Sequence, residues 1–118
     1  MTEIFVFGSN LAGIHGAGSA LEAVKNHGAV YGIGHGIQGY SYAIPTKDWD
    51  VKRSLDLPTI SRYVDIFWAY AYNHPEHTFK IVKIGCGLAG YREDQIKPMF
   101  KDAPPNCILP EGWREHAN

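Results

Sequence analysis

The chain has 118 residues and a formal net charge of −1; 45% of its residues are hydrophobic and 19% are charged. This length suits a single domain with one core, and we expect that domain to span residues 1–118. The balanced charge excludes the strongly basic surface typical of nucleic-acid-binding proteins, and no apolar run is long enough to cross a membrane. We therefore expect neither nucleic acid nor membrane as a partner.

The first half of the chain predicts two buried strands with a helix between them. Residues 3–8, EIFVFG, form a short apolar run that ends at a glycine, which is typical of a buried strand. The SALE segment from Ser19 to Glu22 has the spacing of a capping box and predicts a helix that stops at Gly28. Residues 40–46, YSYAIPT, predict the second strand.

The second half predicts the longest helix. From Pro58, apolar residues recur at spacings of three and four until an NHP segment ends the pattern. Residues 78–85 and 106–110 predict two further strands. Residues 91–100 look helical, but Pro98 lacks a backbone donor and should shorten or bend that helix. Strands that alternate with helices predict an α/β fold, with a mostly parallel sheet covered on both sides.

Two glycine-dense segments follow predicted strands, where ligands bind in open α/β sheets. Residues 8–20, GSNLAGIHGAGSA, lead into a helix N-terminus, whose free N–H groups and dipole favour an anion. Residues 84–91, IGCGLAGY, also connect a strand to a helix. Two such loops facing each other would hold a pyrophosphate between their backbones. The alternative is that the glycines only permit tight turns.

Two common nucleotide motifs are excluded. Residues 13–18, GIHGAG, lack the G-x-G-x-x-G order of a dinucleotide fingerprint, and no G-K-[ST] of a P-loop is present.

The glycine segments carry a resemblance to a known family. SNLAGIHGAGSA at residues 9–20 resembles the macrodomain signature, in which an asparagine precedes a glycine-rich loop that opens a helix. VKIGCGLAGY at residues 82–91 resembles the second phosphate loop of that family, in the IGCGL form of the terminal ADP-ribose protein glycohydrolase branch. The resemblance spans about residues 4–109. It implies a compact, macrodomain-like three-layer α/β/α domain that binds ADP-ribose or a related nucleotide.

The resemblance also implies which residues contact the ligand. It puts Asn10 beside the distal ribose and the two loops on either side of the diphosphate. The implied ligand-binding residues are Ser9, Asn10, Gly16, Ala17, Gly18, Gly85, Cys86, Gly87, Leu88, Ala89, Gly90 and Tyr91. ADP-ribosylated protein is a further implied partner.

Two residues are candidates for catalysis. Lys47, in the IPTK segment, falls where the glycohydrolase branch keeps a lysine nucleophile, which would attack the anomeric carbon if burial lowered its pKa. His15, in the first loop, is a candidate general acid or base or a donor to phosphate, with a solvent-facing loop residue as the alternative. The acidic residue that follows IGCGL in that branch is Ala89 here, which favours a non-catalytic protein.

Other residues with reactive side chains show weaker evidence of a functional role. His74 and His77 lie close together in sequence, but no third ligand is evident, so we expect no metal site, and no cofactor is implied. Cys86 has no base placed beside it and is more typical of a small buried residue than of a nucleophile. The two cysteines make no disulfide framework, and the N-terminus lacks signal-peptide features. Both observations predict a cytoplasmic protein.

Three functions therefore stay open. The first is binding of ADP-ribose or a related nucleotide, with hydrolysis of ADP-ribosyl or ADP-ribose phosphate derivatives. The second is a non-catalytic reader of ADP-ribosylated protein, or a protein that sequesters such a nucleotide. The third is a scaffold that keeps the fold without the ligand.

Overall fold

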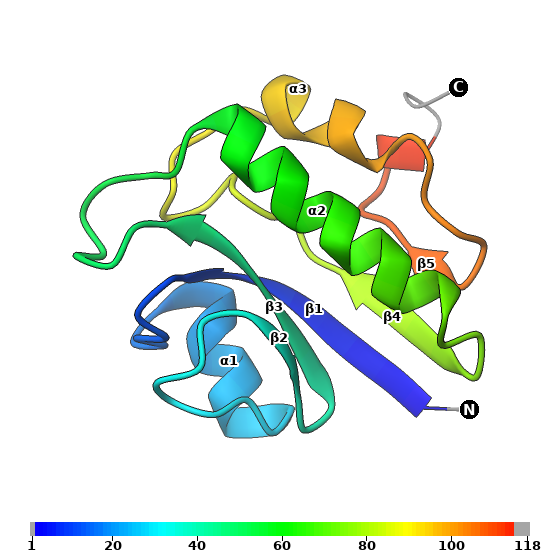
Figure 1. Ribbon diagram of the computed structural model, residues 1–118, viewed down its shortest axis with the longest axis horizontal. Helices are drawn as coiled ribbons and strands as arrows, with labels where there is room; N and C mark the ends of the chain where they lie inside the picture. The colour runs from blue at the N-terminus through cyan, green and yellow to red at the C-terminus, as the bar shows by residue number, and fades with distance from the viewer. Residues whose placement is uncertain (1, 115–118) are drawn as a thin grey trace.

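The computed structural model describes residues 2–114 (Figure 1). Its strands are β1 (Thr2–Asn10), β2 (Gly36–Gln38), β3 (Ser41–Lys47), β4 (His77–Ile81) and β5 (Cys107–Ile108). Its helices include α1 (Gly18–Asn26), α2 (Leu57–Tyr72) and the short α3 (Glu93–Ile96), which continues as the 3-10 helix η1 (Lys97–Phe100). Within residues 2–114, no helix has the length and apolar character needed to span a bilayer.

The strands form one mixed sheet in the order β2-β3-β1-β4-β5. β1 pairs in parallel with β3 and β4, and β4 pairs in parallel with β5. The sheet is not wholly parallel, because β2 pairs with β3 in antiparallel fashion. β2 was not predicted, because three residues among glycines show no hydrophobic periodicity. Gly39, at φ +59°, helps to make the tight turn that joins β2 to β3.

Helices lie on both faces of the sheet, as the alternating pattern of strands and helices predicted (Figure 1). Successive side chains of a strand point to opposite faces. In β1, Ile4 and Val6 belong to the hydrophobic cluster that includes the buried face of α2. Phe5 and Phe7 belong to a smaller cluster with Ala20 of α1. Both faces of β1 are therefore covered, which explains why residues 4–7 are all apolar.

The longest helix, α2, confirms the prediction made from its sequence. It begins after Asp56, whose carboxylate accepts a 2.9 Å hydrogen bond from the backbone N–H of Thr59, and Pro58 lies in the first turn. The apolar stripe faces the sheet, with Tyr63 only partly buried. Its buried members are Ile60, Val64, Phe67, Trp68 and Ala71.

The start of α1 differs from the prediction. The N-cap residue is Ala17, and no side chain caps the helix, so the predicted capping box between Ser19 and Glu22 is wrong. Ser19 falls inside the first turn because the helix begins at Gly18. The predicted stop is confirmed, since the helix ends just before Gly28, which has φ +76°.

Three later elements are shorter than predicted. The strand expected over 78–85 ends at Ile81, because the chain then turns and reaches Gly85 at φ +78°, which no strand accommodates. The helix expected over 91–100 is α3 followed by η1, and the change to the tighter helix coincides with Pro98, as the missing donor predicted. The last strand keeps only two of the residues expected over 106–110.

Candidate functional site

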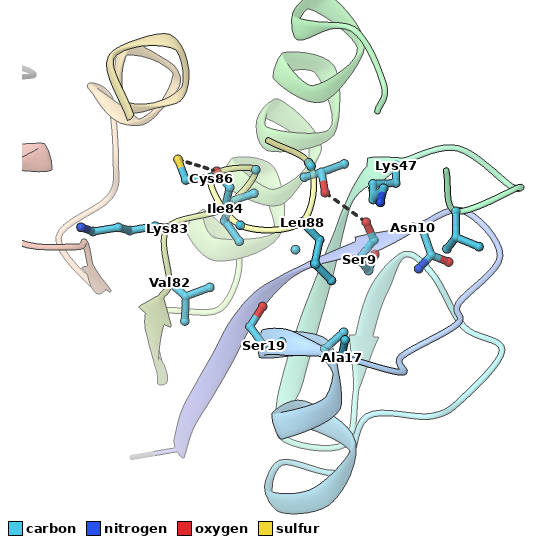
Figure 2. Close-up of a pocket in the computed structure, with 18 of the residues that line it drawn as sticks. Ser9, Asn10, Ala17, Ser19, Lys47, Val82, Lys83, Ile84, Cys86 and Leu88 are labelled. Atoms are coloured by element: carbon cyan, nitrogen blue, oxygen red, sulfur yellow. Dashed lines mark hydrogen bonds between the residues drawn. The ribbon is translucent and has the colours of Figure 1, made fainter. Parts of the chain in front are cut away.

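A cavity of about 710 Å³ opens where β1 and β3 end and the chain leaves β4. Figure 2 shows the N-terminal end of α1 on one side and the segment around Ile84 and Leu88 on the other. Ligands of α/β sheets bind at this end of the strands. The lining residues are Gly8, Ser9, Asn10, Ile14, Gly16, Ala17, Gly18, Ser19, Ala20, Thr46, Lys47, Val51, Val82, Lys83, Ile84, Gly85, Cys86, Gly87, Leu88 and Ala89.

The two predicted glycine loops therefore face each other across one cavity. Of the twelve residues implied to contact a ligand, the cavity takes in all except Gly90 and Tyr91. The Tyr91 hydroxyl instead donates a 2.5 Å hydrogen bond to the Leu55 carbonyl, which anchors the end of the second loop to the segment before α2. Leu88 lies near the start of α1, since its Cδ1 is 3.8 Å from the position that a Cβ on Gly18 would occupy.

Asn10 fixes the shape of the first loop. Its side-chain amide donates a 2.8 Å hydrogen bond to the Ile14 carbonyl, and its side-chain oxygen accepts a 2.9 Å hydrogen bond from the Ile14 N–H. Its neighbour Ser9 donates from its hydroxyl to the carbonyl of Gly34. Both side chains thus hold backbone at the cavity wall.

The glycines in and against the first loop serve two different purposes. A Cβ on Gly13 would lie 2.3 Å from the carbonyl carbon of Gly32, and one on Gly34 would lie 2.1 Å from the Asn10 carbonyl oxygen. These glycines let two backbone segments pack directly on each other. A Cβ on Gly16 would meet nothing within 4 Å, and Gly16 lines the cavity. The space in front of Gly16 is therefore free for a ligand.

The second loop is folded on itself by backbone hydrogen bonds. The Gly90 N–H donates to Gly87 at 3.0 Å, and the Tyr91 N–H donates to Gly85 at 2.9 Å. A hydroxyl from the segment after β3 joins it, since Ser54 donates a 2.6 Å hydrogen bond to the Ala89 carbonyl. A Cβ on Gly87 would meet nothing within 4 Å. Gly87, like Gly16, borders open space in the cavity.

Lys47 lies at the C-terminal end of β3 and lines the cavity close to Asn10 (Figure 2). The segment after it turns back, so that Lys47 and Ser54 form an isolated antiparallel bridge. Within this turn Val51 lines the cavity and has φ +58°. A β-branched residue at positive φ is strained, and such strain concentrates at functional sites.

The charges at the cavity favour an anion. Among the described lining residues, Lys47 and Lys83 are the charged ones, and none is acidic. Figure 2 shows the Lys83 side chain turned away from the cavity, and its ammonium lies 3.1 Å from the Glu93 carboxylate. Hydrogen bonds from the Trp113 indole and from Lys83 hold the pKa of Glu93 below its usual range. Within residues 2–114, Lys47 forms no salt bridge.

Cys86 lines the cavity without being an activated nucleophile. Burial raises the pKa of its thiol, and the nearby Glu93 carboxylate raises it further, while Lys83 opposes this. The thiol donates to the Ile84 carbonyl at a sulfur–oxygen distance of 3.6 Å. A thiol with a raised pKa forms less thiolate at neutral pH, which is the opposite of what catalysis by cysteine needs.

His15 does not line the cavity and is not exposed. Only 1% of its surface is accessible, its Nε2 lies 3.0 Å from the Ile33 carbonyl oxygen, and its ring packs edge-on against Phe7 with centroids 5.4 Å apart. The structure brings it under the first loop, between that loop and the segment before β2. Both sequence interpretations, a group acting on the ligand and a solvent-facing residue, therefore disagree with its position.

The other histidines within residues 2–114 do not line the cavity. His35 packs edge-on against Tyr63 with centroids 5.0 Å apart, and burial lowers its pKa. The Glu76 carboxylate lies near both His74 and His77, so the structure places a third potential donor beside the two histidines.

Part of the cavity wall was not predicted. Val51, Val82 and Lys83 line the cavity but were not among the implied ligand-binding residues, although Val82 and Lys83 begin the VKIGCGLAGY segment. Val82 and Lys83 immediately precede the IGCGL segment, so their position between a strand and a ligand loop was a usable signal. Val51 had none, because its place depends on how the turn after β3 folds.

Comparison of the chain with protein-family models, with curated proteins and with solved structures gives no match.

Proposed function

We propose that this protein binds ADP-ribose or a related nucleotide in the cavity between its two glycine loops, with the diphosphate between Gly16 and Gly87. The observation that carries the proposal is that both glycines border open space on facing walls of one cavity. Backbone without side chains allows phosphate oxygens to approach the N–H groups closely. The cavity volume of about 710 Å³ also falls in the range of small-molecule sites, roughly 300–1,000 Å³.

The N-terminus of α1 supports an anionic ligand. Gly18, Ser19 and Ala20 of its first turn line the cavity, and no side chain caps the helix. The first N–H groups of a helix need a hydrogen-bond partner. In α2 the Asp56 side chain supplies one, whereas α1 has no such side chain. A phosphate would accept from these N–H groups and interact favourably with the helix dipole.

The fold supports a macrodomain-like arrangement. Helices on both faces of a central sheet, with a ligand cavity between a β1–α1 loop and a loop after β4, agree with the three-layer α/β/α architecture that the resemblance implies. The antiparallel strand β2 is compatible with it, because it extends only one edge of the sheet.

Binding without catalysis is favoured over hydrolysis by one observation. Among the described residues that line the cavity, none is a carboxylate or an imidazole, the groups that most often act as general acids and bases. Lys47 is the one group there to which the resemblance gives a covalent role, as a nucleophile at the anomeric carbon. We therefore propose a reader or sequestering protein first, and a hydrolase that uses Lys47 second.

Calorimetric titration with ADP-ribose tests the proposal. Separate titrations with AMP, NAD and cyclic ADP-ribose show whether the protein prefers another ligand. We expect saturable binding of ADP-ribose to the wild-type protein. Gly87→Val should abolish it, because the new side chain enters the space proposed for the diphosphate without meeting protein atoms at its Cβ. Ala69→Val, on the exposed face of α2, is the matched control and should bind like the wild type.

The possible outcomes separate the alternatives. Unchanged binding in a folded Gly87→Val variant would overturn the proposed position of the diphosphate. Preference for another of the four ligands would overturn the ADP-ribose assignment. If ADP-ribose binds, release of free ADP-ribose from ADP-ribosylated protein, lost in Lys47→Ala, would favour the hydrolase over the reader.

A further inference from the structure

A second cluster of reactive side chains lies far from the cavity in the fold, at the opposite end of β4. His74 and Glu76 lie in the turn between α2 and β4, and His77 is the first residue of β4 (Figure 1). His74 Nδ1 lies 3.0 Å from Glu76 Oε2, and His77 Nε2 lies 3.6 Å from the same oxygen. One donor atom from each residue falls within 4.8 Å of the others. This cluster shares no residue with the proposed nucleotide site.

Two of the three distances between donor atoms, those to Glu76, are close to the distances between ligands of a metal ion. Bonds of about 2.0–2.1 Å in a tetrahedral site put neighbouring ligand atoms roughly 3.3–3.4 Å apart. The two separations to Glu76 lie on either side of that value. Small shifts of three side chains would therefore bring two nitrogens and one oxygen around a single ion.

The turn that carries the cluster is held in place without any metal. The Asn106 side-chain amide donates to the backbone carbonyls of Ala71, His74 and His77, each at 3.2 Å. The His77 N–H also donates to the His74 carbonyl at 3.1 Å. A turn tied by one side chain to three carbonyls keeps both histidines at a fixed separation.

The rings themselves are also positioned by packing. His74 stacks on Tyr70 with centroids 4.2 Å apart, and His77 packs edge-on against Phe79 at 5.9 Å. The two imidazoles lie nearly parallel, 5.7 Å apart. Because the ligands are already ordered, binding an ion costs little additional side-chain entropy.

We propose that His74, Glu76 and His77 form a binding site for Zn²⁺ or a neighbouring divalent ion such as Co²⁺ or Ni²⁺. Two imidazole nitrogens and one carboxylate oxygen suit these ions, whereas Mg²⁺ and Ca²⁺ prefer oxygen ligands alone. Three protein ligands leave a fourth position for water. The bound ion would link the end of α2 to the start of β4.

The test uses untagged, chelator-treated protein titrated with Co²⁺ and followed by visible absorption, then with Zn²⁺ in competition. We expect one Co²⁺ per chain and its displacement by Zn²⁺. Removal of one ligand, in Glu76→Gln or His74→Ala, should weaken binding by at least roughly tenfold. Glu76 is exposed and His74 is partly buried, and circular dichroism of each variant checks that it folds.

A matched control comes from α1. His27 Nε2 lies 3.5 Å from the Glu22 carboxylate, a similar pair without a third donor in the described chain. His27→Ala should bind Co²⁺ like the wild type. Absence of saturable Co²⁺ and Zn²⁺ binding would overturn the proposal, as would equal affinity in the wild type and in folded Glu76→Gln. ADP-ribose titration of Glu76→Gln should be unchanged, which keeps this proposal separate from the nucleotide site.

Discussion

Asn10 and Ile14 form a closed ring of two hydrogen bonds, in which the asparagine amide donates to the Ile14 carbonyl and its oxygen accepts from the Ile14 N–H. The asparagine thus acts as a clamp on the first loop as well as a wall of the cavity. The resemblance implies a contact between Asn10 and a ribose. That contact would have to use the second N–H of the side-chain amide or the remaining lone pair of its oxygen.

Asn10→Ala should therefore destabilise the protein as well as weaken ligand binding. The change leaves a backbone donor and acceptor without their partners, which typically costs about 1–3 kcal/mol. Urea unfolding measures the loss, and Asn10→Asp should not avoid it, because a buried carboxylate oxygen would then face the Ile14 carbonyl oxygen in place of the donor. An Asn10→Ala variant as stable as the wild type would contradict the clamp.

Val51→Gly should stabilise the protein. Val51 has φ +58°, and relief of a non-glycine left-handed conformation is worth about 1–2 kcal/mol, from which glycine's greater unfolded-state entropy subtracts roughly 0.5–1 kcal/mol. Thermal and urea unfolding measure the net gain. Val30→Gly, at an exposed valine outside the positive-φ region, is the control and should lose stability. A loss in both variants would mean that Val51 is not strained.

Cys86 should react slowly with iodoacetamide at neutral pH and faster as the pH rises, because burial raises the pKa of its thiol. ADP-ribose should slow this reaction further, since Cys86 lines the cavity. Cys107 is the internal control: it is buried, burial raises its pKa to about 12, and it should stay unmodified in the folded protein. Mass spectrometry of the labelled chain measures both. Rapid labelling of Cys86 at neutral pH would contradict the raised pKa.

The cap of α2 should make stability depend on pH in the acid range. Hydrogen bonds from Thr59 lower the pKa of Asp56 in the folded protein. The stabilisation is therefore present above the unfolded-state pKa and is lost as the pH falls through the lower, folded-state pKa. The difference in urea midpoint between the wild type and Asp56→Ala should shrink over that range.

Asp56→Asn separates capping from charge in the same experiment. Asparagine also caps helices, so this variant should keep most of the stability at neutral pH. It should show none of the pH dependence that comes from Asp56. A pH dependence equal to that of the wild type would assign the effect to another carboxylate.

The sequence predicted the parts of the fold that depend on strong local patterns. The apolar run of β1 and the periodic stripe of α2, with its proline in the first turn, were sufficient for both elements. Prediction was poor for elements whose boundaries or pairing depend on tertiary contacts. The capping box of α1 failed because the N-cap is Ala17, two residues before Ser19, and β2 was missed because it is a three-residue strand whose pairing with β3 no local pattern indicates.

The candidate site divides in the same way. The glycine loops could be found from their composition, and ten of their implied ligand residues line one cavity. The burial of His15 and the contribution of Val51 could not be found, because both follow from how distant loops fold against each other. Glu76 was adjacent to His77 in the sequence, and only the turn geometry shows that its carboxylate reaches both histidines.

The division of the glycines has a consequence for how this protein tolerates change. At Gly13 and Gly34, backbone of another segment occupies the place of a Cβ, so in saturation mutagenesis every side chain there should be lost to misfolding. At Gly16 and Gly87 the position of a Cβ is empty, so side chains there should be compatible with the fold. Their effect should be on ligand binding alone. The second pair is therefore where a chain with this architecture acquires a new ligand specificity without losing its scaffold.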